Sequence, residues 1–201
     1  MAKRPFHHGD LRNALVKAAK DLIERNGMEA FALREAARKV GVSANAAYNH
    51  FKDKDALLCA VASSGFEELA MQREVARAKA NPDAWSQMQA GAKVYVQFAE
   101  ARPKLFDLMF SPVGVGPGRG QADSSEPSSR RAYQQLSEAL DNLVLSGRVT
   151  PERRAGAEGT LWSLIHGLAV LRRAGALREP FEESWERMTT FTAQALGLKP
   201  N

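Results

Sequence analysis

The chain has 201 residues, which is enough for a hydrophobic core in one domain or in a small domain joined to a medium one. Its net charge is +5, and residues 1–55 hold eleven basic side chains against seven acidic ones, a distribution typical of a segment that binds a polyanion. Cys59 is the only cysteine, which excludes an intrachain disulfide, and no apolar run approaches the roughly 20 residues that cross a bilayer. We expect a cytoplasmic protein with no membrane partner.

Helical periodicity runs along most of the chain, and no useful length alternates with the period of a strand. Helices are expected at about 9–26, within 31–51 (two short ones), and at about 53–81, 85–101, 105–110, 130–145, 151–171 and 181–196. Residues 111–129 are rich in glycine, proline and serine, and we expect a flexible loop there. The pattern predicts an all-α fold of about nine helices.

Residues 31–51 carry the most specific pattern. Leu33, Ala36, Ala37 and Val40 make one side of a first short helix apolar, and Gly41 follows, where a helix can end in a left-handed conformation. Ser43 can cap the next helix. Ala47 and Phe51 point inward, so the outer positions are Ala44, Asn45, Ala46, Tyr48, Asn49 and His50. This pattern predicts a helix-turn-helix whose second helix lies in a DNA major groove.

The first 70 residues or so carry a specific set of motifs: His8-Gly9-Asp10-Leu11, Leu33-Arg34-Glu35-Ala36-Ala37, Gly41-Val42-Ser43, Tyr48-x-His50-Phe51 and Lys52-x-Lys54-x-x-Leu57-Leu58. Together these segments resemble the DNA-binding domain of TetR-family transcriptional regulators. The resemblance implies a three-helix DNA-binding domain over residues 1–55, a connecting helix to about residue 80, and a ligand-binding and dimerisation domain over residues 82–201.

A weaker resemblance continues into the second half of the chain. The segments are Tyr95-Val96-x-Phe98, Pro103-x-Leu105-Phe106-x-Leu108-Met109-Phe110 and Trp162-x-x-x-His166-Gly167. They look like the C-terminal domain of the TetR subgroup named for its Trp-His-Gly signature. This match implies an architecture more than a ligand.

Several outer side chains have the chemistry of DNA contacts. The amide of Asn45 can pair with adenine, and Ala46 can pack on a thymine methyl group. Tyr48 and His50 match the family's contact positions, which implies hydrogen bonds to phosphates, although Tyr48 could also be simple packing. The ammonium of Lys54 can reach a phosphate beside a helix N-terminus. Arg34 suits a phosphate, a guanine edge or merely solvent.

Two positions depart from the family pattern. Ala32 stands where the family usually has Ser or Thr to cap the second helix, and Asn49 stands where related sequences often have arginine. Both changes favour modest affinity per half-site or a greater share from base contacts. The expected DNA-binding residues are Arg34, Ser43, Asn45, Ala46, Tyr48, Asn49, His50 and Lys54.

Aromatic and methionine side chains are dense beyond Pro82. They can surround a pocket for a small hydrophobic or aromatic effector, or they can be packed core, and the sequence leaves both open. The candidate ligand-binding residues are Trp85, Met88, Tyr95, Phe98, Phe106, Met109, Phe110, Trp162 and His166. The position of His166 on an apolar helix face favours a core histidine over a ligand contact.

The last two expected helices carry apolar residues on more than one side, among them Leu164, Leu171, Met188 and Phe191. One helix cannot bury two faces within one subunit, so we expect a homodimer through these helices. Such a dimer sets two recognition helices in successive major grooves.

The leading interpretation is a repressor that an effector releases from a palindromic DNA operator. An enzyme is not expected, because no nucleophile–base pair, paired carboxylates in an apolar setting or phosphate-binding loop appears. No metal or cofactor is expected either, since His7, His8 and Asp10 lie near a flexible terminus. The alternative is a helical adaptor or small-molecule-binding protein without specific DNA binding.

Overall fold

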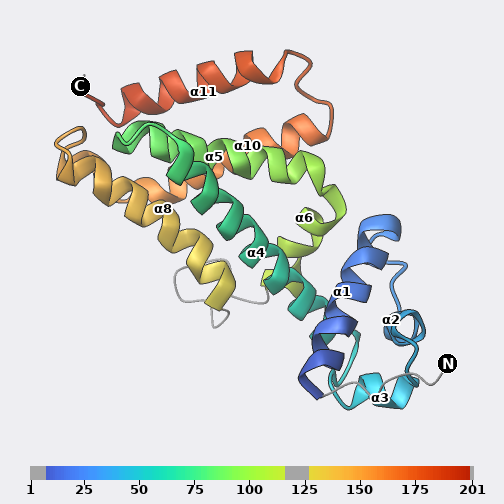
Figure 1. Ribbon diagram of the computed structural model, residues 1–201. Helices are drawn as coiled ribbons and strands as arrows, with labels where there is room; N and C mark the ends of the chain where they lie inside the picture. Colours follow the sequence, from blue (N-terminus) through green and yellow to red (C-terminus); the bar gives the residue numbers. More distant parts are fainter. Residues whose placement is uncertain (1–7, 116–126, 200–201) are drawn as a thin grey trace. The chain divides into compact units, whose positions relative to one another are not determined.

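A computed structural model of the protein describes residues 8–115 and 127–199, and within these ranges all regular structure is α-helical (Figure 1). The predicted all-α fold is confirmed. The eleven described helices are α1 His8–Asn26, α2 Leu33–Val40, α3 Ala44–Tyr48, α4 Lys54–Lys79, α5 Ala84–Ala101, α6 Pro103–Met109, α7 Pro112–Val115, α8 Pro127–Leu145, α9 Pro151–Arg154, α10 Ala157–Arg173 and α11 Phe181–Ala195.

Two short helices account for the difference from the expected nine. Within the predicted loop, α7 forms because Pro112 suits a first helical position and Ser111 Oγ accepts from the Gly114 N–H at 3.1 Å. The single helix expected from Pro151 is two, since Gly156 (φ 69°) separates α9 from α10. Residues 116–126 of that loop, the N-terminal residues 1–7 and the side chains of His8 and Asp10 lie outside the described residues.

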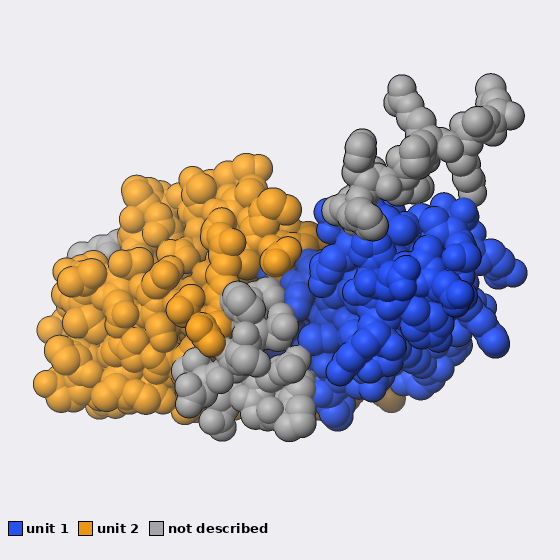
Figure 2. Space-filling model, turned by 90° about the horizontal axis from the view of Figure 1, so that it is seen from below, with its two compact units in different colours: residues 1–66, 102–126 blue, residues 67–101, 127–201 orange. Residues whose placement is uncertain are grey.

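The chain forms two compact units, shown in different colours in Figure 2. Unit 1 comprises residues 1–66 and 102–126, and unit 2 comprises residues 67–101 and 127–201. Helix α4 contributes residues to both. The domain limits expected from the sequence, 1–55 and 82–201, stay a prediction.

In unit 1, α1 packs against α2 and α6, and α2 packs against α3. The core forms because each helix has one apolar stripe, and Leu15 and Ile23 of α1 are fully buried. Polar contacts fix the rim of this packing: Lys39 Nζ lies 2.7 Å from Asp21 Oδ2, and Arg102 Nη1 lies 2.5 Å from Glu24 Oε1.

A glycine allows the first part of α4 to approach α6 closely. A Cβ placed on Gly65 would lie 2.7 Å from Sδ of Met109 and 3.3 Å from Cδ1 of Leu105. These distances are shorter than van der Waals contact, so no side chain fits between the two helices here. Gly65 therefore serves packing, within an unbroken helix.

In unit 2, α5 packs against α10 and α8, and α10 packs also against α8 and α11 (Figure 1). Its apolar core gathers residues from α8, α10 and the loops that follow α8 and α11. The core residues are Leu140, Leu143, Val149, Leu161 and Leu196, with Trp85, Met88, Leu136 and Leu164 packed against them.

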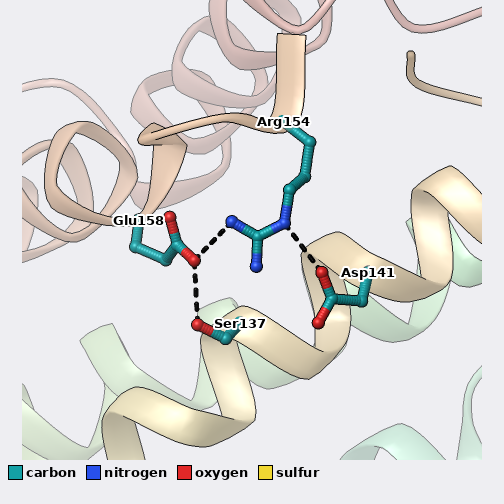
Figure 3. A network of polar contacts seen from close by, with 4 residues as sticks. All are labelled: Ser137, Asp141, Arg154 and Glu158. Atoms are coloured by element: carbon teal, nitrogen blue, oxygen red, sulfur yellow. Dashed lines mark hydrogen bonds and ion pairs between the residues drawn. The ribbon is translucent and has the colours of Figure 1, made fainter. Parts of the chain in front are cut away.

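A polar network fastens α8, α9 and α10 to one another (Figure 3). Arg154 Nε lies 2.7 Å from Asp141 Oδ1, and Nη1 of the same guanidinium lies 2.5 Å from Glu158 Oε1. Ser137 Oγ donates to the same Glu158 oxygen at 2.9 Å. Because Glu158 is buried, these partners replace the water that a carboxylate needs.

Candidate nucleic-acid interface and effector site

The turn between α2 and α3 is built on Gly41. This residue has φ 82° and ψ 33°, and its N–H donates to the carbonyls of Ala37 and Arg38 at 2.8 and 3.1 Å. The next N–H, of Val42, donates to the Ala37 carbonyl at 3.0 Å. The last turn of α2 thus ends with its free carbonyls satisfied, and the chain turns sharply into α3.

Helix α3 begins at a capped N-terminus and buries one face. Ser43 Oγ accepts from the Ala46 N–H at 3.2 Å, as the sequence predicts for an N-cap. Ala47 is fully buried, and Phe51 just after the helix is 3% exposed. The guanidinium of Arg12 from α1 lies 5.0 Å from the centroid of the Phe51 ring, a cation–π contact.

The opposite side of α3 faces solvent. Asn45 and Asn49 are exposed, and half of the Tyr48 side chain (51%) is exposed although tyrosine is largely apolar. Ala46 and His50 are partly buried at the edges of this face. The structure therefore brings these five predicted contact residues together on one short helix and its end.

Three further predicted contact residues lie before or after α3 in the sequence: Arg34, Ser43 and Lys54. Lys54 is the first residue of α4, and its Nζ donates to the Glu29 carbonyl at 3.4 Å, which leaves further N–H groups of the ammonium for an anion. Asp53 caps α4 by accepting from the Ala56 N–H at 2.7 Å. Arg34 and Ser43 are exposed.

The start of α2 has the weaker cap that the sequence predicts. Ala32 occupies the N-cap position, with no side-chain hydrogen bond to the helix. The ion pair between Lys39 and Asp21 holds the far end of α2 on α1 instead. Sequence reasoning missed this pair and the Arg12–Phe51 contact, because their partners are 18 and 39 residues apart in the chain.

Three of the predicted ligand-binding residues form a hydrogen-bonded cluster in unit 2. Tyr95 of α5 lies with its hydroxyl 2.8 Å from Nδ1 of His166 on α10, and Trp162 Nε1 donates to the same hydroxyl at 3.4 Å. The rings of Trp162 and His166 meet edge to face, with centroids 6.1 Å apart. The Trp-His-Gly segment is thus joined to Tyr95.

Burial favours the uncharged forms of Tyr95 and His166. It raises the pKa of Tyr95 far above its ordinary value of 10, and it lowers the pKa of His166 below 6.5, with Arg173 adding to that decrease. The Tyr95 hydroxyl thus accepts from Trp162 Nε1 and shares a second hydrogen bond with Nδ1 of His166.

The other predicted ligand-binding residues are divided between the units. Trp85 and Met88 pack against the core of unit 2, and Phe98 is buried on α5. Phe106, Met109 and Phe110 belong to unit 1, where the Phe110 ring meets Phe66 at 5.4 Å. The assignment of these six residues to an effector site stays a prediction.

Sequence reasoning overlooked a basic group beside the Tyr95 cluster. Arg73 lies in the unit 2 part of α4, and its Nε is buried. Burial first and then the like charge of Arg77 lower the pKa of Arg73 to about 10, while Tyr95 opposes them. A signal existed in the sequence, because the buried stripe of α4 through Phe66, Leu69 and Ala70 continues at helical spacing into Arg73.

The described residues hold neither a metal-binding cluster nor a membrane-spanning helix. Their His, Cys, Asp and Glu side chains form no group of three that is arranged to hold a metal ion. None of their helices has the length and apolar character that a bilayer crossing requires.

Comparisons with known proteins match both halves of the chain to one family. Residues 15–61 match the family described as "Bacterial regulatory proteins, tetR family", and residues 88–192 match the "Tetracyclin repressor-like, C-terminal domain". No curated protein matches the chain.

Solved structures share the fold over nearly the whole chain. A protein of unknown function from Rhodococcus sp. RHA1 is 29% identical, covers 96% of this chain and 99% of its own, and has a TM-score of 0.81. A TetR family transcription regulator from Marinobacter aquaeolei VT8 is 18% identical, with coverage of 92% and 95% and a TM-score of 0.67. RolR, solved in complex with its ligand resorcinol, is 16% identical, with coverage of 96% and 90% and a TM-score of 0.70.

The C-terminal match alone spans more than half of the chain, and the N-terminal match falls on the helices that form the helix-turn-helix. The chain belongs to the TetR family and is a DNA-binding transcriptional regulator.

Proposed function

We propose that the protein is a homodimeric repressor that binds a palindromic operator through α3 and leaves it when a small molecule binds unit 2. One observation carries the DNA-binding part: α3 buries Ala47 on one side and presents Asn45, Tyr48 and Asn49 to solvent on the other. A short helix with one polar face exposed fits the width of a major groove.

Different residues contact the bases and the phosphates in this proposal. Asn45 reads adenine with its amide, and Ala46 packs on a thymine methyl group. Tyr48, His50 and Lys54 donate to phosphates, and Arg34 adds a further positive charge at the start of α2. Asn49 lies at the C-cap of α3, and Ser43 orders the start of the helix through its cap.

The last two helices form the proposed dimer interface. Leu171 on α10 and Phe191 on α11 are 47% and 58% exposed in the single chain, while Leu164 and Met188 are half-buried. Leu161, Leu168, Ala169 and Trp185 are buried within unit 2 and so are not available to a partner. A two-fold dimer places two copies of α3 about 34 Å apart, one helical turn of DNA.

The effector site is proposed for the region around Tyr95, Trp162 and His166. Its combination of aromatic rings with few polar groups suits a hydrophobic or aromatic ligand. RolR, which shares the fold, was solved with resorcinol, an aromatic compound. Bound ligand would favour a dimer whose recognition helices no longer match adjacent grooves, and a few kcal/mol of coupling suffices for such a switch.

Selection of bound duplexes from a random pool, followed by titration of the selected duplex, tests this function. We expect an inverted repeat whose halves are about one helical turn apart, bound by two chains. Small molecules that bind unit 2 should then weaken the complex. Selection of unrelated sequences, or a complex that every bound ligand leaves unchanged, would contradict the proposal.

A further inference from the structure

Arg12 on α1 reaches the chain just after α3. Its guanidinium carbon lies 5.0 Å from the centroid of the Phe51 ring. Leu15, three residues after Arg12, is fully buried, so Arg12 lies at the edge of the apolar stripe of α1. Side chains of a helix point toward its N-terminus, which directs Arg12 past the first turn of α1. The start of α1 and α3 accordingly lie beside each other within unit 1 (Figure 1).

The contact places an exposed cation on a buried ring. Arg12 is exposed, whereas Phe51 is 3% exposed. A guanidinium that stacks on a ring keeps its N–H donors, because these lie in the plane of the group. The ring also restricts the positions that the long side chain can take, so less conformational freedom is lost when the guanidinium binds an anion.

The shortness of α3 brings this guanidinium near the edge of the DNA groove. A helix of five residues is about 7.5 Å long, and the major groove is about 12 Å wide. Groups just beyond the end of such a helix therefore lie near the phosphates that border the groove. Phe51 is such a group, since its N–H donates to the carbonyl of Ala47 in α3 at 3.0 Å. Arg12 lies on its ring.

The residues next to Phe51 in the chain are also basic or able to donate. His50 precedes it, and Lys52 follows it with 84% of its side chain exposed. The acidic neighbour, Asp53, accepts from the Ala56 N–H at 2.7 Å and lies 3.8 Å from Lys52 Nζ, so its charge is partly compensated. The end of α3 thus suits an anion, and Arg12 adds a positive charge from a different helix.

We propose that Arg12 is a further DNA-contact residue, whose guanidinium donates to a backbone phosphate at the edge of the groove that α3 occupies. The proposal rests on the proposed placement of α3 in a major groove and adds a contact from α1. Arginine suits a phosphate because its parallel N–H groups match two phosphate oxygens. Since phosphate contacts fix the orientation of a protein on DNA, Arg12 orients α3 for base reading.

Titration of the selected duplex at several salt concentrations tests this contact. Arg12→Met keeps an apolar cover on Phe51 but removes the charge, and the domain should remain folded because the position is exposed. We expect at least tenfold weaker binding and a slope of log K against log salt reduced by about two in a dimer. Arg25→Met, an equal charge change at an exposed position in the last turn of α1, is the matched control. A wild-type slope in Arg12→Met, or equal decreases in both variants, would overturn the assignment.

Neutral methylphosphonate groups, placed one at a time along the duplex, distinguish a phosphate contact from a role in holding α3. We expect one position in each half-site where the neutral group weakens binding by the wild type but has little further effect on Arg12→Met. Arg12→Lys keeps the charge and should stay sensitive at that position. If Arg12→Met is as sensitive as the wild type at every phosphate, Arg12 acts only through Phe51 and the proposal is wrong.

An unselected duplex separates this proposal from the proposed function. Phosphate contacts do not depend on base sequence, so Arg12→Met should lower the salt slope on this duplex too. If it does so while no inverted repeat can be selected, the Arg12 contact stands and operator recognition fails. If Asn45→Ala relaxes the preference for a selected operator while Arg12→Met binds like the wild type, operator recognition stands and the Arg12 contact fails.

Discussion

His166 illustrates how one half-buried side chain can report on the state of unit 2. Burial lowers the pKa of its imidazole below 6.5, with Arg173 as the second cause, and Tyr95 lies 2.8 Å from Nδ1. The unfolded chain takes up a proton near pH 6.5, whereas the folded chain takes it up only at lower pH. The neutral histidine therefore contributes stability above pH 6.5 that is lost as the pH falls below it.

Replacement of this histidine should flatten the pH dependence of stability. We expect the melting temperature of the wild type to fall more between about pH 7.5 and pH 5.5 than that of His166→Gln, which has no proton to take up. Thermal unfolding followed by circular dichroism measures both. Parallel curves for the two proteins would show that His166 titrates alike in the folded and unfolded chains.

At the scale of elements, the turn between α2 and α3 depends on the backbone of Gly41. Its φ of 82° lies in the left-handed region, where a side chain costs about 1 kcal/mol or more. This position also sets the direction of α3, and hence the presentation of Asn45 and Tyr48.

Gly41→Ala should thus lower the free energy of unfolding by about 1 kcal/mol and weaken operator binding. Gly159→Ala is the matched control, since Gly159 lies within α10 and nothing lies within 4 Å of an added Cβ, so this change should stabilise the protein by up to about 1 kcal/mol. Urea denaturation and duplex titration give the two quantities. Full stability in Gly41→Ala would mean that the turn adapts without strain.

The network of α8, α9 and α10 depends on an ionised carboxylate. Burial raises the pKa of Glu158, but hydrogen bonds from its own backbone N–H, Ser137 and Arg154 outweigh burial and lower the pKa below 4.5 overall. A carboxyl group with a lowered pKa stabilises the folded state above its unfolded pKa, and this contribution disappears as the pH falls through the folded pKa.

We expect Glu158→Gln to cost about 1–2 kcal/mol near neutral pH, with a smaller difference from the wild type below pH 4.5. Glu183→Gln breaks an exposed pair with Arg187 on α11 and should cost about 0.5 kcal/mol or less. Chemical denaturation at several pH values provides the comparison. Equal costs for the two variants would contradict the role of burial in this network.

The sequence predicted well those helices and turns whose signals lie close together in the chain. Periodic apolar residues located the long helices, and Gly41 with Ser43 located the helix-turn-helix. The short helix α7 was not predicted, because the segment is rich in glycine and proline and the cap from Ser111 is only a weak helix signal. The Tyr95–His166 contact joins residues 71 positions apart, so no local pattern predicts it.

At the scale of the whole molecule, the proposed function requires two chains. The exposed Leu171 and Phe191 are apolar surface on the last two helices of a single chain, where the sequence analysis expects the partner. A two-fold interface uses each such residue twice, so one substitution changes two contacts.

Phe191→Glu should therefore raise the dimer dissociation constant by about a hundredfold or more, since two phenylalanine burials are lost. The position is 58% exposed, so the single chain should remain folded. Leu145→Glu, at an 84% exposed position of α8, is the control and should leave the dimer intact. Sedimentation velocity distinguishes these results, and dissociation by Leu145→Glu alone would place the interface elsewhere.

The contact of α3 with DNA is the claim on which the rest depends. Its most direct test is the affinity for the selected operator as a function of salt, measured for the wild type, Lys54→Ala and Asn45→Ala. Loss of the two Lys54 contacts in a dimer should reduce the slope of log K against log salt by about two with the sequence preference kept. Loss of the Asn45 amide should relax the preference at one base pair of each half-site. If neither variant changes the salt slope or the sequence preference, α3 and Lys54 do not contact the operator as proposed.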